Sequence, residues 1–76
     1  MTMTQGTQQI TADIAANVWQ VLVTEGATVS AGDTLVILES MKMEIPVEAE
    51  EGGTVTKLAV KEGDVLDEGA LIAEIG

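Results

Sequence analysis

The sequence predicts an all-β domain, a flattened β-sandwich or β-barrel with an internal pseudo-twofold axis. Three observations lead to this prediction. The apolar residues occur in short runs bounded by glycine, which is the pattern of strands joined by turns. The chain repeats itself once, and its 76 residues suffice for only one small core. We therefore expect one domain over residues 8–76, preceded by a flexible, polar tail over residues 1–7.

The repeat becomes visible when the chain is slid along itself until Val18 lies on Val55. The same shift matches residues over the rest of the chain without a gap, including Val29 with Leu66, Gly32 with Gly69, Leu35 with Ile72 and Leu38 with Ile75. A gapless match of this length favours internal duplication over chance. Two similar halves suggest two sheets that face each other, with each half supplying strands to both.

The expected strands follow in the same order in each copy. They cover residues 18–23 and 34–38 in the first copy, and residues 54–60 and 71–75 in the second. Their apolar residues alternate only partly, as expected where a small two-sheet fold buries one face of each strand and part of the other. Turns that need a positive φ or a close backbone approach are expected at the glycines with matching positions, Gly26, Gly32, Gly63 and Gly69.

The core is expected to be aliphatic, because 46% of the residues are hydrophobic but only Trp19 is aromatic. Trp19 is out of period with Val18 and Val21, so we expect it to cover a sheet edge and to keep its indole N–H in water. The predicted core residues are Val18, Val21, Val23, Leu35, Ile37, Ile45, Val55, Leu58, Val60, Leu66 and Ile72.

Charge and composition exclude several classes of function. Thirteen Asp and Glu against three Lys give a formal net charge of −10, which repels nucleic acid and anionic membranes. This charge is consistent with solubility alone and with steering toward a basic protein surface, and the sequence does not separate the two. Without cysteine or histidine there is no disulfide, no thiolate and no metal site built on these ligands. The sequence has no membrane-length apolar run and no secretory signal, so we expect a cytoplasmic protein.

Lys42 lies where the two copies meet, and the shift gives it no structured counterpart. Taken alone, the segment Glu39-Ser40-Met41-Lys42-Met43-Glu44 has good helical propensity. It is too short between two strands to hold a helix, and Pro46 restrains the residue before it to extended geometry. We therefore predict a tight hairpin with Met41-Lys42 at its tip, although such turns favour Asn-Gly or Asp-Gly. A turn that breaks this rule and exposes two methionines indicates a function.

The chemistry expected of Lys42 is that of an accessible primary amine that another enzyme can acylate. An isolated surface lysine is more often only solvated, and the hairpin setting is what favours a role. No neighbouring apolar pocket or second cation is expected to turn it into a catalyst. We therefore expect no catalytic residue and no metal, and a carrier that other enzymes modify.

The chain resembles the biotin carboxyl carrier proteins, the biotinyl domains of biotin-dependent carboxylases. The resemblance rests on Glu39-Ser40-Met41-Lys42-Met43 and on Gly53-Thr54-Val55, and it covers residues 10–76. It implies a barrel-sandwich hybrid, a flattened β-barrel of two four-stranded antiparallel sheets related by a quasi-twofold axis. It also implies that the lysine lies on a hairpin remote from both termini.

Residue roles follow from the resemblance by position. Lys42 matches the lysine that accepts biotin, and Met41 and Met43 match its flanking methionines. These flexible, polarizable side chains are suited to brief docking with more than one enzyme, or they fill a gap in the hairpin. Glu39 and Glu44 are candidate contacts for the ligase, or ordinary solvated charges.

The resemblance further implies a sequence of partners. A biotin protein ligase uses ATP to activate biotin and transfers it to the Lys42 amine as an amide. The chain then carries carboxybiotin from a biotin carboxylase to a carboxyltransferase, at a high effective concentration. Alone, the carrier is expected to be a monomer that is a substrate of these enzymes and not itself an enzyme.

Two departures from the family pattern narrow the assignment. Position 40 is Ser where Ala is common, which is a mild change, and residues 24–33 leave no room for the protruding thumb of certain acetyl-CoA carboxylase carriers. The chain also begins with its own methionine and lacks a preceding Ala/Pro-rich linker, so we expect a stand-alone biotinyl or biotin/lipoyl attachment protein.

Two other functions remain open. A lipoyl carrier shares the fold and a hairpin lysine, but lipoyl domains usually show Asp-Lys-Ala or Asp-Lys-Val at the tip, whereas methionines flank Lys42. An unmodified interaction module of the same sandwich fold would need flanking helical hairpins, which the sequence lacks, and would leave Met-Lys-Met unexplained.

Overall fold

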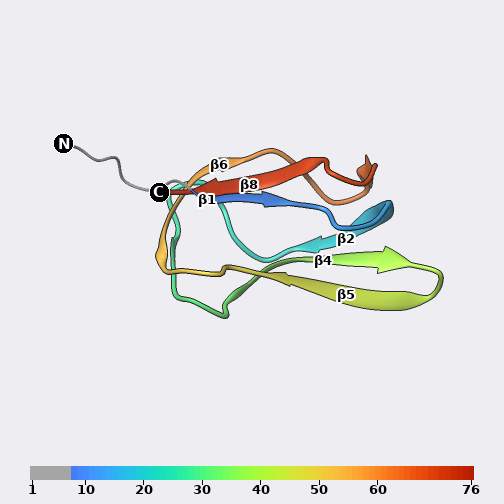
Figure 1. The fold of residues 1–76 in the computed structure, drawn as a ribbon, viewed down its shortest axis with the longest axis horizontal. Helices are drawn as coiled ribbons and strands as arrows, with labels where there is room; N and C mark the ends of the chain where they lie inside the picture. The colour runs from blue at the N-terminus through green and yellow to red at the C-terminus, as the bar shows by residue number, and fades with distance from the viewer. Residues whose placement is uncertain (1–7) are drawn as a thin grey trace.

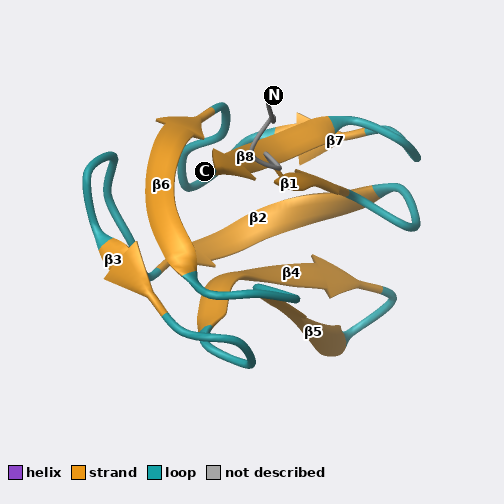
Figure 2. Ribbon diagram, turned by 60° about the vertical axis from the view of Figure 1, so that its left-hand side comes forward, coloured by secondary structure: helices purple, strands orange, loops and turns teal. Residues whose placement is uncertain are grey.

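The computed structural model describes residues 8–76, so the expected tail over residues 1–7 lies outside the described part of the chain. Residues 8–76 fold into strands joined by turns, without a helix (Figure 2). In particular, they form no helix of the kind that would traverse a lipid bilayer. The strands are β1 (Gln8–Thr11), β2 (Ala16–Val21), β3 (Thr28–Val29), β4 (Thr34–Ser40), β5 (Met43–Glu48), β6 (Gly53–Leu58), β7 (Val65–Leu66) and β8 (Leu71–Ile75).

The strands form two four-stranded sheets that pack as two layers (Figure 1). Sheet A has the order β1-β8-β6-β3 and sheet B the order β5-β4-β2-β7. Every neighbouring pair is antiparallel. The predicted fold class, two four-stranded antiparallel sheets in a flattened sandwich, is confirmed.

The shift that places Val18 on Val55 relates the two sheets to each other. It carries β2 onto β6 and β3 onto β7 with identical bounds, and it carries β1 onto β5 and β4 onto β8. The pairing registers follow: Val18 opposite Leu38 in sheet B recurs as Val55 opposite Ile75 in sheet A. The β-bulges recur at equivalent places as well. The predicted pseudo-twofold is therefore present in every ladder, and each sheet takes strands from both copies.

The predicted glycine turns also follow the pseudo-twofold. The φ angles of Gly26 and Gly63 are 90° and 92°, and those of Gly32 and Gly69 are 88° and 87°. A Cβ added at any of the four would meet nothing within 4 Å, so the positive φ requires glycine there and close packing does not. The Gly26 N–H donates to the Val55 carbonyl oxygen at 2.8 Å, and the Gly63 N–H donates to that of Val18 at 2.9 Å. Each turn is thereby tied to a strand of the other copy.

The core lies between the two sheets and is aliphatic, as predicted. Of the eleven predicted members, Val18, Leu35, Val55, Val60, Leu66 and Ile72 are buried, while Val21, Val23, Ile45 and Leu58 are partly buried and pack against them. The remaining buried residues are Ile10, Ala12, Ala16, Val29, Val36, Leu38, Ala49, Ala73 and Ile75.

Two expectations about the core are wrong. Val36 and Leu38 point inward, so Ile37 between them lies on the outer face of sheet B and remains half-buried. Trp19 does not cover a sheet edge, because β2 lies between β4 and β7. It is the extra residue of the bulge between Val18 and Gln20, and 45% of its surface is exposed on the outer face.

Candidate functional site

The hairpin between β4 and β5 has the geometry predicted for it. Ser40 pairs with Met43, which leaves Met41-Lys42 as a two-residue turn. The φ angles of Met41 and Lys42 are 52° and 66°. A two-residue hairpin turn with positive φ at both central positions is of type I′, whose twist matches that of the flanking strands. The turn geometry is therefore set by the sheet, although neither residue favours it.

The turn holds two side chains in a backbone conformation that glycine or asparagine adopts more readily. Among residues 8–76, Met41 and Lys42 are the only non-glycine residues with positive φ. For such residues the left-handed region costs roughly 1–2 kcal/mol each. Strain of this kind persists where the surrounding structure imposes it, and it is concentrated at functional sites. The strained pair thus marks the tip as a candidate site.

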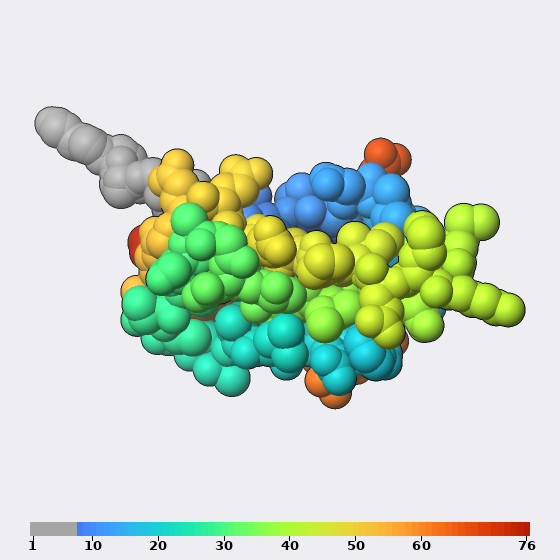
Figure 3. All heavy atoms as spheres, turned by 90° about the horizontal axis from the view of Figure 1, so that it is seen from below, coloured from blue at the N-terminus to red at the C-terminus, as the bar shows by residue number. Residues whose placement is uncertain are grey.

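The tip projects from the body of the domain. The β4–β5 hairpin extends beyond the other strands at the end opposite the C-terminus (Figure 1). In the space-filling view its atoms, in yellow-green, stand out from the surface as a prong (Figure 3). Met41 is 89% exposed, Met43 is 58% exposed, and Lys42 between them is exposed as well. The amine is therefore accessible to a macromolecular partner.

Two carboxylates face each other directly behind the tip. Glu39 and Glu44 are cross-strand partners on the outer face of sheet B, and Asn17 lies opposite Glu39 on the other side. Like charges in direct opposition destabilise a sheet. The hairpin therefore combines a strained turn with a repulsive pair, and neither feature favours the fold itself.

Removing one of the two charges is expected to stabilise the domain. Glu44→Gln keeps the side-chain length but ends the repulsion, so the free energy of unfolding should rise by about 0.2–1 kcal/mol. The gain should shrink at high salt, which already screens exposed charges. Urea unfolding at low and at high ionic strength measures both effects. Glu68→Gln, at an exposed turn position, is the control. A loss of stability in Glu44→Gln would contradict the repulsion.

A groove beside the hairpin was not predicted from the sequence. It has a volume of about 420 Å³ and lies between the hairpin root, the β1–β2 connection and β7. Its walls include Ala15, Ser40 and Val65, and Val65 is 78% exposed. One signal in the sequence points to this position: the shift pairs Val65 with a polar residue, Thr28, on β3. The groove places a surface of mixed polar and apolar residues within reach of the Lys42 side chain.

The arrangement suits modification of Lys42 by another enzyme. The side chains on the hairpin around Lys42 are those of serine, methionine and glutamate, and the chain contains no histidine or cysteine. The five predicted site residues lie together on this one hairpin: Glu39, Met41, Lys42, Met43 and Glu44. An exposed primary amine on a flexible stem fits attachment of a carboxylic acid cofactor through an amide bond.

Comparison with known proteins agrees with this chemistry. A family sequence model described as "Biotin-requiring enzyme" matches residues 6–75. The biotinylated protein TB7.3 homolog of Mycobacterium leprae is 52% identical over 68 residues, which make up 90% of this chain and 96% of that protein. A biotin-dependent acyl-coenzyme A carboxylase alpha3 subunit of the same organism is 47% identical over 66 residues, which are 87% of this chain but only 11% of the subunit.

A solved structure gives the same result in three dimensions. The urea carboxylase of Kluyveromyces lactis matches with a TM-score of 0.87 and 30% identity, covering 100% of this chain and 7% of that enzyme. The fold thus occurs both as nearly a whole small protein and as a small part of large carboxylases. The family match over almost the whole chain, with these relatives, establishes that the chain belongs to the biotin attachment domains of the biotin-requiring enzymes.

Proposed function

We propose that this chain is a biotin carboxyl carrier whose Lys42 accepts biotin as an amide from a biotin protein ligase. The observation that carries the proposal is the exposed lysine at the tip of a strained two-residue turn, in a domain of the biotin attachment family. Residues 8–76 would be the carrier unit, a non-catalytic substrate of the ligase. The net charge of −10 opposes self-association, which supports a monomer.

In the attachment step the deprotonated Lys42 amine attacks the carboxyl carbon of biotinyl-AMP. The new C–N bond forms the amide, the bond to the phosphate oxygen breaks, and AMP leaves with its electron pair. The amine nitrogen gives up its remaining excess proton. We expect the ligase to supply the base that takes the first proton.

The neighbouring side chains would serve recognition. Met41 and Met43 present flexible apolar surface on both sides of the amine, and such surface adapts to more than one partner. Glu39 and Glu44 add negative charge directly behind the tip, which attracts basic residues of a ligase. The cost in fold stability of the exposed methionines and the opposed carboxylates would thus be offset by partner binding.

The fold contributes a rigid base for a tether. The sheet pairing of β4 with β5 extends to Ser40 and Met43, so flexibility begins only at the Lys42 side chain. Attached biotin supplies a ureido nitrogen that carries a carboxyl group. A biotin carboxylase and a carboxyltransferase would act on it in turn, and tethering raises its effective concentration at both sites.

Mass spectrometry of the intact chain tests the proposal. The purified apo chain is incubated with a biotin protein ligase, biotin and ATP, beside Lys42→Arg and the control Lys57→Arg. Wild type and Lys57→Arg should each gain one biotinyl group, and Lys42→Arg should gain none. If wild type stays unmodified while a known acceptor domain is labelled in the same tube, the proposal fails, and lipoyl ligase becomes the next enzyme to try.

A further inference from the structure

The pseudo-twofold provides an internal control for the outer faces of the two sheets. We term the residue that the shift assigns to a given position its twin. On the outer face of sheet B, three neighbouring positions carry apolar side chains, Trp19, Ile37 and Pro46. Their twins on the outer face of sheet A are Thr56, Glu74 and Gln9, all polar. The same backbone positions therefore carry apolar residues on one sheet only.

The contacts on sheet A show that these positions are side by side. The Thr56 hydroxyl donates to the Glu74 carbonyl oxygen at 3.1 Å, and the Gln9 amide donates to the Glu74 carboxylate at 3.4 Å. On sheet B, Ile37 is directly opposite Pro46 and next to the bulge that contains Trp19. We name Trp19, Ile37 and Pro46 the outer strip. Trp19 and Pro46 are exposed and Ile37 is half-buried.

The fold does not require the outer strip to be apolar. Sheet A keeps the same registers and the same bulges with threonine, glutamate and glutamine at these positions. Single exposed apolar residues are ordinary on a protein surface. Three neighbouring apolar residues whose twins on the other sheet are all polar indicate an interaction surface. Tryptophan is also one of the residue types enriched at the energetic centre of interfaces.

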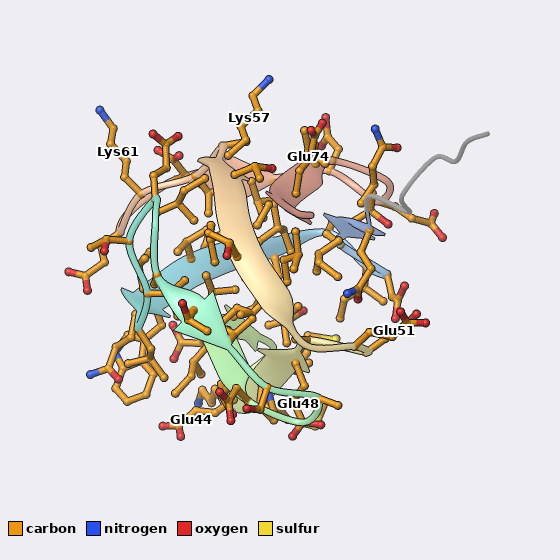
Figure 4. The ribbon with its side chains drawn as sticks, turned by 90° about the vertical axis from the view of Figure 1, so that its left-hand side faces the viewer. Glu44, Glu48, Glu51, Lys57, Lys61 and Glu74 are labelled. Atoms are coloured by element: carbon orange, nitrogen blue, oxygen red, sulfur yellow. The ribbon has the colours of Figure 1, made fainter. Side chains whose placement is uncertain are left out.

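The charges around the outer strip indicate which surface charge a partner should have. The strands of sheet B carry Glu39, Glu44 and Glu48 and no lysine, whereas those of sheet A carry Lys57 and Glu74. Figure 4 shows Lys57 and Glu74 projecting on one side of the sandwich and Glu44 and Glu48 on the opposite side. A second copy of this acidic chain would be repelled. The complementary partner presents an apolar contact bordered by Lys or Arg.

The distance from the tip identifies which partner can use this surface. Pro46 follows Lys42 by four strand positions, which is roughly 13 Å along the hairpin. A standard interface buries about 800 Å² on each partner, equivalent to a disc with a radius of about 16 Å. An enzyme that acts on the amine of Lys42 itself must approach the tip within the length of a lysine side chain. Such an interface, centred on Lys42, extends over the outer strip.

We propose that the outer strip is the docking surface for the biotin protein ligase, which meets it with an apolar contact bordered by basic residues. This inference rests on the proposed attachment of biotin to Lys42. It assigns a role to Trp19, which is remote from the tip in the sequence. It also assigns a role to Ile37 and Pro46, which are separated from the tip by the Glu39–Glu44 pair. Trp19 on β2 is the expected anchor, and Glu44 and Glu48 place negative charge on both sides of Pro46 on β5.

Steady-state kinetics of biotinylation, with the apo chain as the varied substrate, tests the docking surface. The main variant is Trp19→Thr/Pro46→Gln, in which a polar twin-like residue replaces each apolar one. Its KM should rise about 10- to 30-fold, as for loss of an interface anchor, while kcat should stay within twofold because Lys42 is untouched. The matched control is Thr56→Ala/Lys57→Ala on sheet A, whose KM should not change.

A second variant tests the apolar contact independently, and the salt dependence of KM tests the charged border. Ile37→Thr retains a β-branched residue, and it should raise KM several-fold with its thermal unfolding still cooperative. Added salt should raise the KM of the wild-type chain, because it screens the attraction between its carboxylates and a basic ligase surface. This rise should be smaller in Glu48→Gln, which has lost one of the carboxylates. Unchanged KM in Ile37→Thr and in the folded double variant would overturn the docking surface while the proposed function stands. No biotin on the wild-type chain would overturn both.

Discussion

Replacement of Met41-Lys42 by Asn-Gly is expected to stabilise the domain and to abolish biotin attachment. Both residues have positive φ, and Asn-Gly is the pair that a type I′ turn favours. Relief of the backbone strain should raise the free energy of unfolding by about 1–2 kcal/mol, after allowing for the larger entropy of glycine in the unfolded chain. Urea unfolding measures the stability, and intact mass after incubation with ligase, biotin and ATP measures attachment.

The single variant Met41→Asn separates the two effects. Asparagine relieves the strain at one position and leaves the Lys42 amine in place, so about half of the stability gain should appear and attachment should continue. Its KM for the ligase should rise, because an apolar contact beside the lysine is lost. A double variant that is less stable than wild type would show that the turn is not strained as described. Modification of the double variant would place attachment elsewhere.

Leu35→Ala is expected to remove a large part of the stability of the domain. The Leu35 side chain is 0% exposed at the centre of the core. Truncation of such a leucine typically destabilises by about 2–5 kcal/mol through lost burial and the cavity left behind. A chain of 76 residues has a total stability of roughly 4–11 kcal/mol. Thermal unfolding followed by circular dichroism should therefore show a much lower midpoint, or an unfolded chain at room temperature.

The pseudo-twofold provides a matched variant in the second copy for comparison with Leu35→Ala. Ile72 is the twin of Leu35 and is also 0% exposed, so Ile72→Ala should destabilise to a similar extent. Val65→Ala, at a position 78% exposed, should change the stability by less than about 0.5 kcal/mol. Each variant should unfold in one transition, because both sheets contain strands of both copies. Two separate transitions in Leu35→Ala would show that the copies are independent folding units, against this topology.

The fold was predictable because its signals are local and are repeated. Glycine-bounded apolar runs mark the strands, and the positive φ at Gly26 and Gly63 follows from a turn that both copies share. The tight hairpin at Met41-Lys42 was predictable for a different reason, since two strand patterns leave only a short segment between them. Residues 39–44 favour a helix by propensity but form a hairpin between the two strands, because a short helix is not stable by its own propensity.

The wrong predictions share a physical cause. Trp19 is the extra residue of the bulge in β2, and Ile37 lies next to the bulges of β2 and β4. One extra residue on a strand changes which side chains face the core. Bulges depend on how two strands meet in space, and apolar periodicity along one strand does not reveal them. The strands Gln8–Thr11, Thr28–Val29, Met43–Glu48 and Val65–Leu66 were not among the expected ones either, and a strand of two residues carries no periodic signal.

By itself, the sequence determined the duplicated β-sandwich, its aliphatic core, and the lysine at the junction of the copies as the candidate for attachment. These features depend on composition and on neighbours in the chain. The tertiary structure decided which strands from each copy share a sheet, and hence that Trp19 joins Ile37 and Pro46 in one surface. Such contacts arise from pairing between segments far apart in the chain, and a pattern along a single strand contains no information about them.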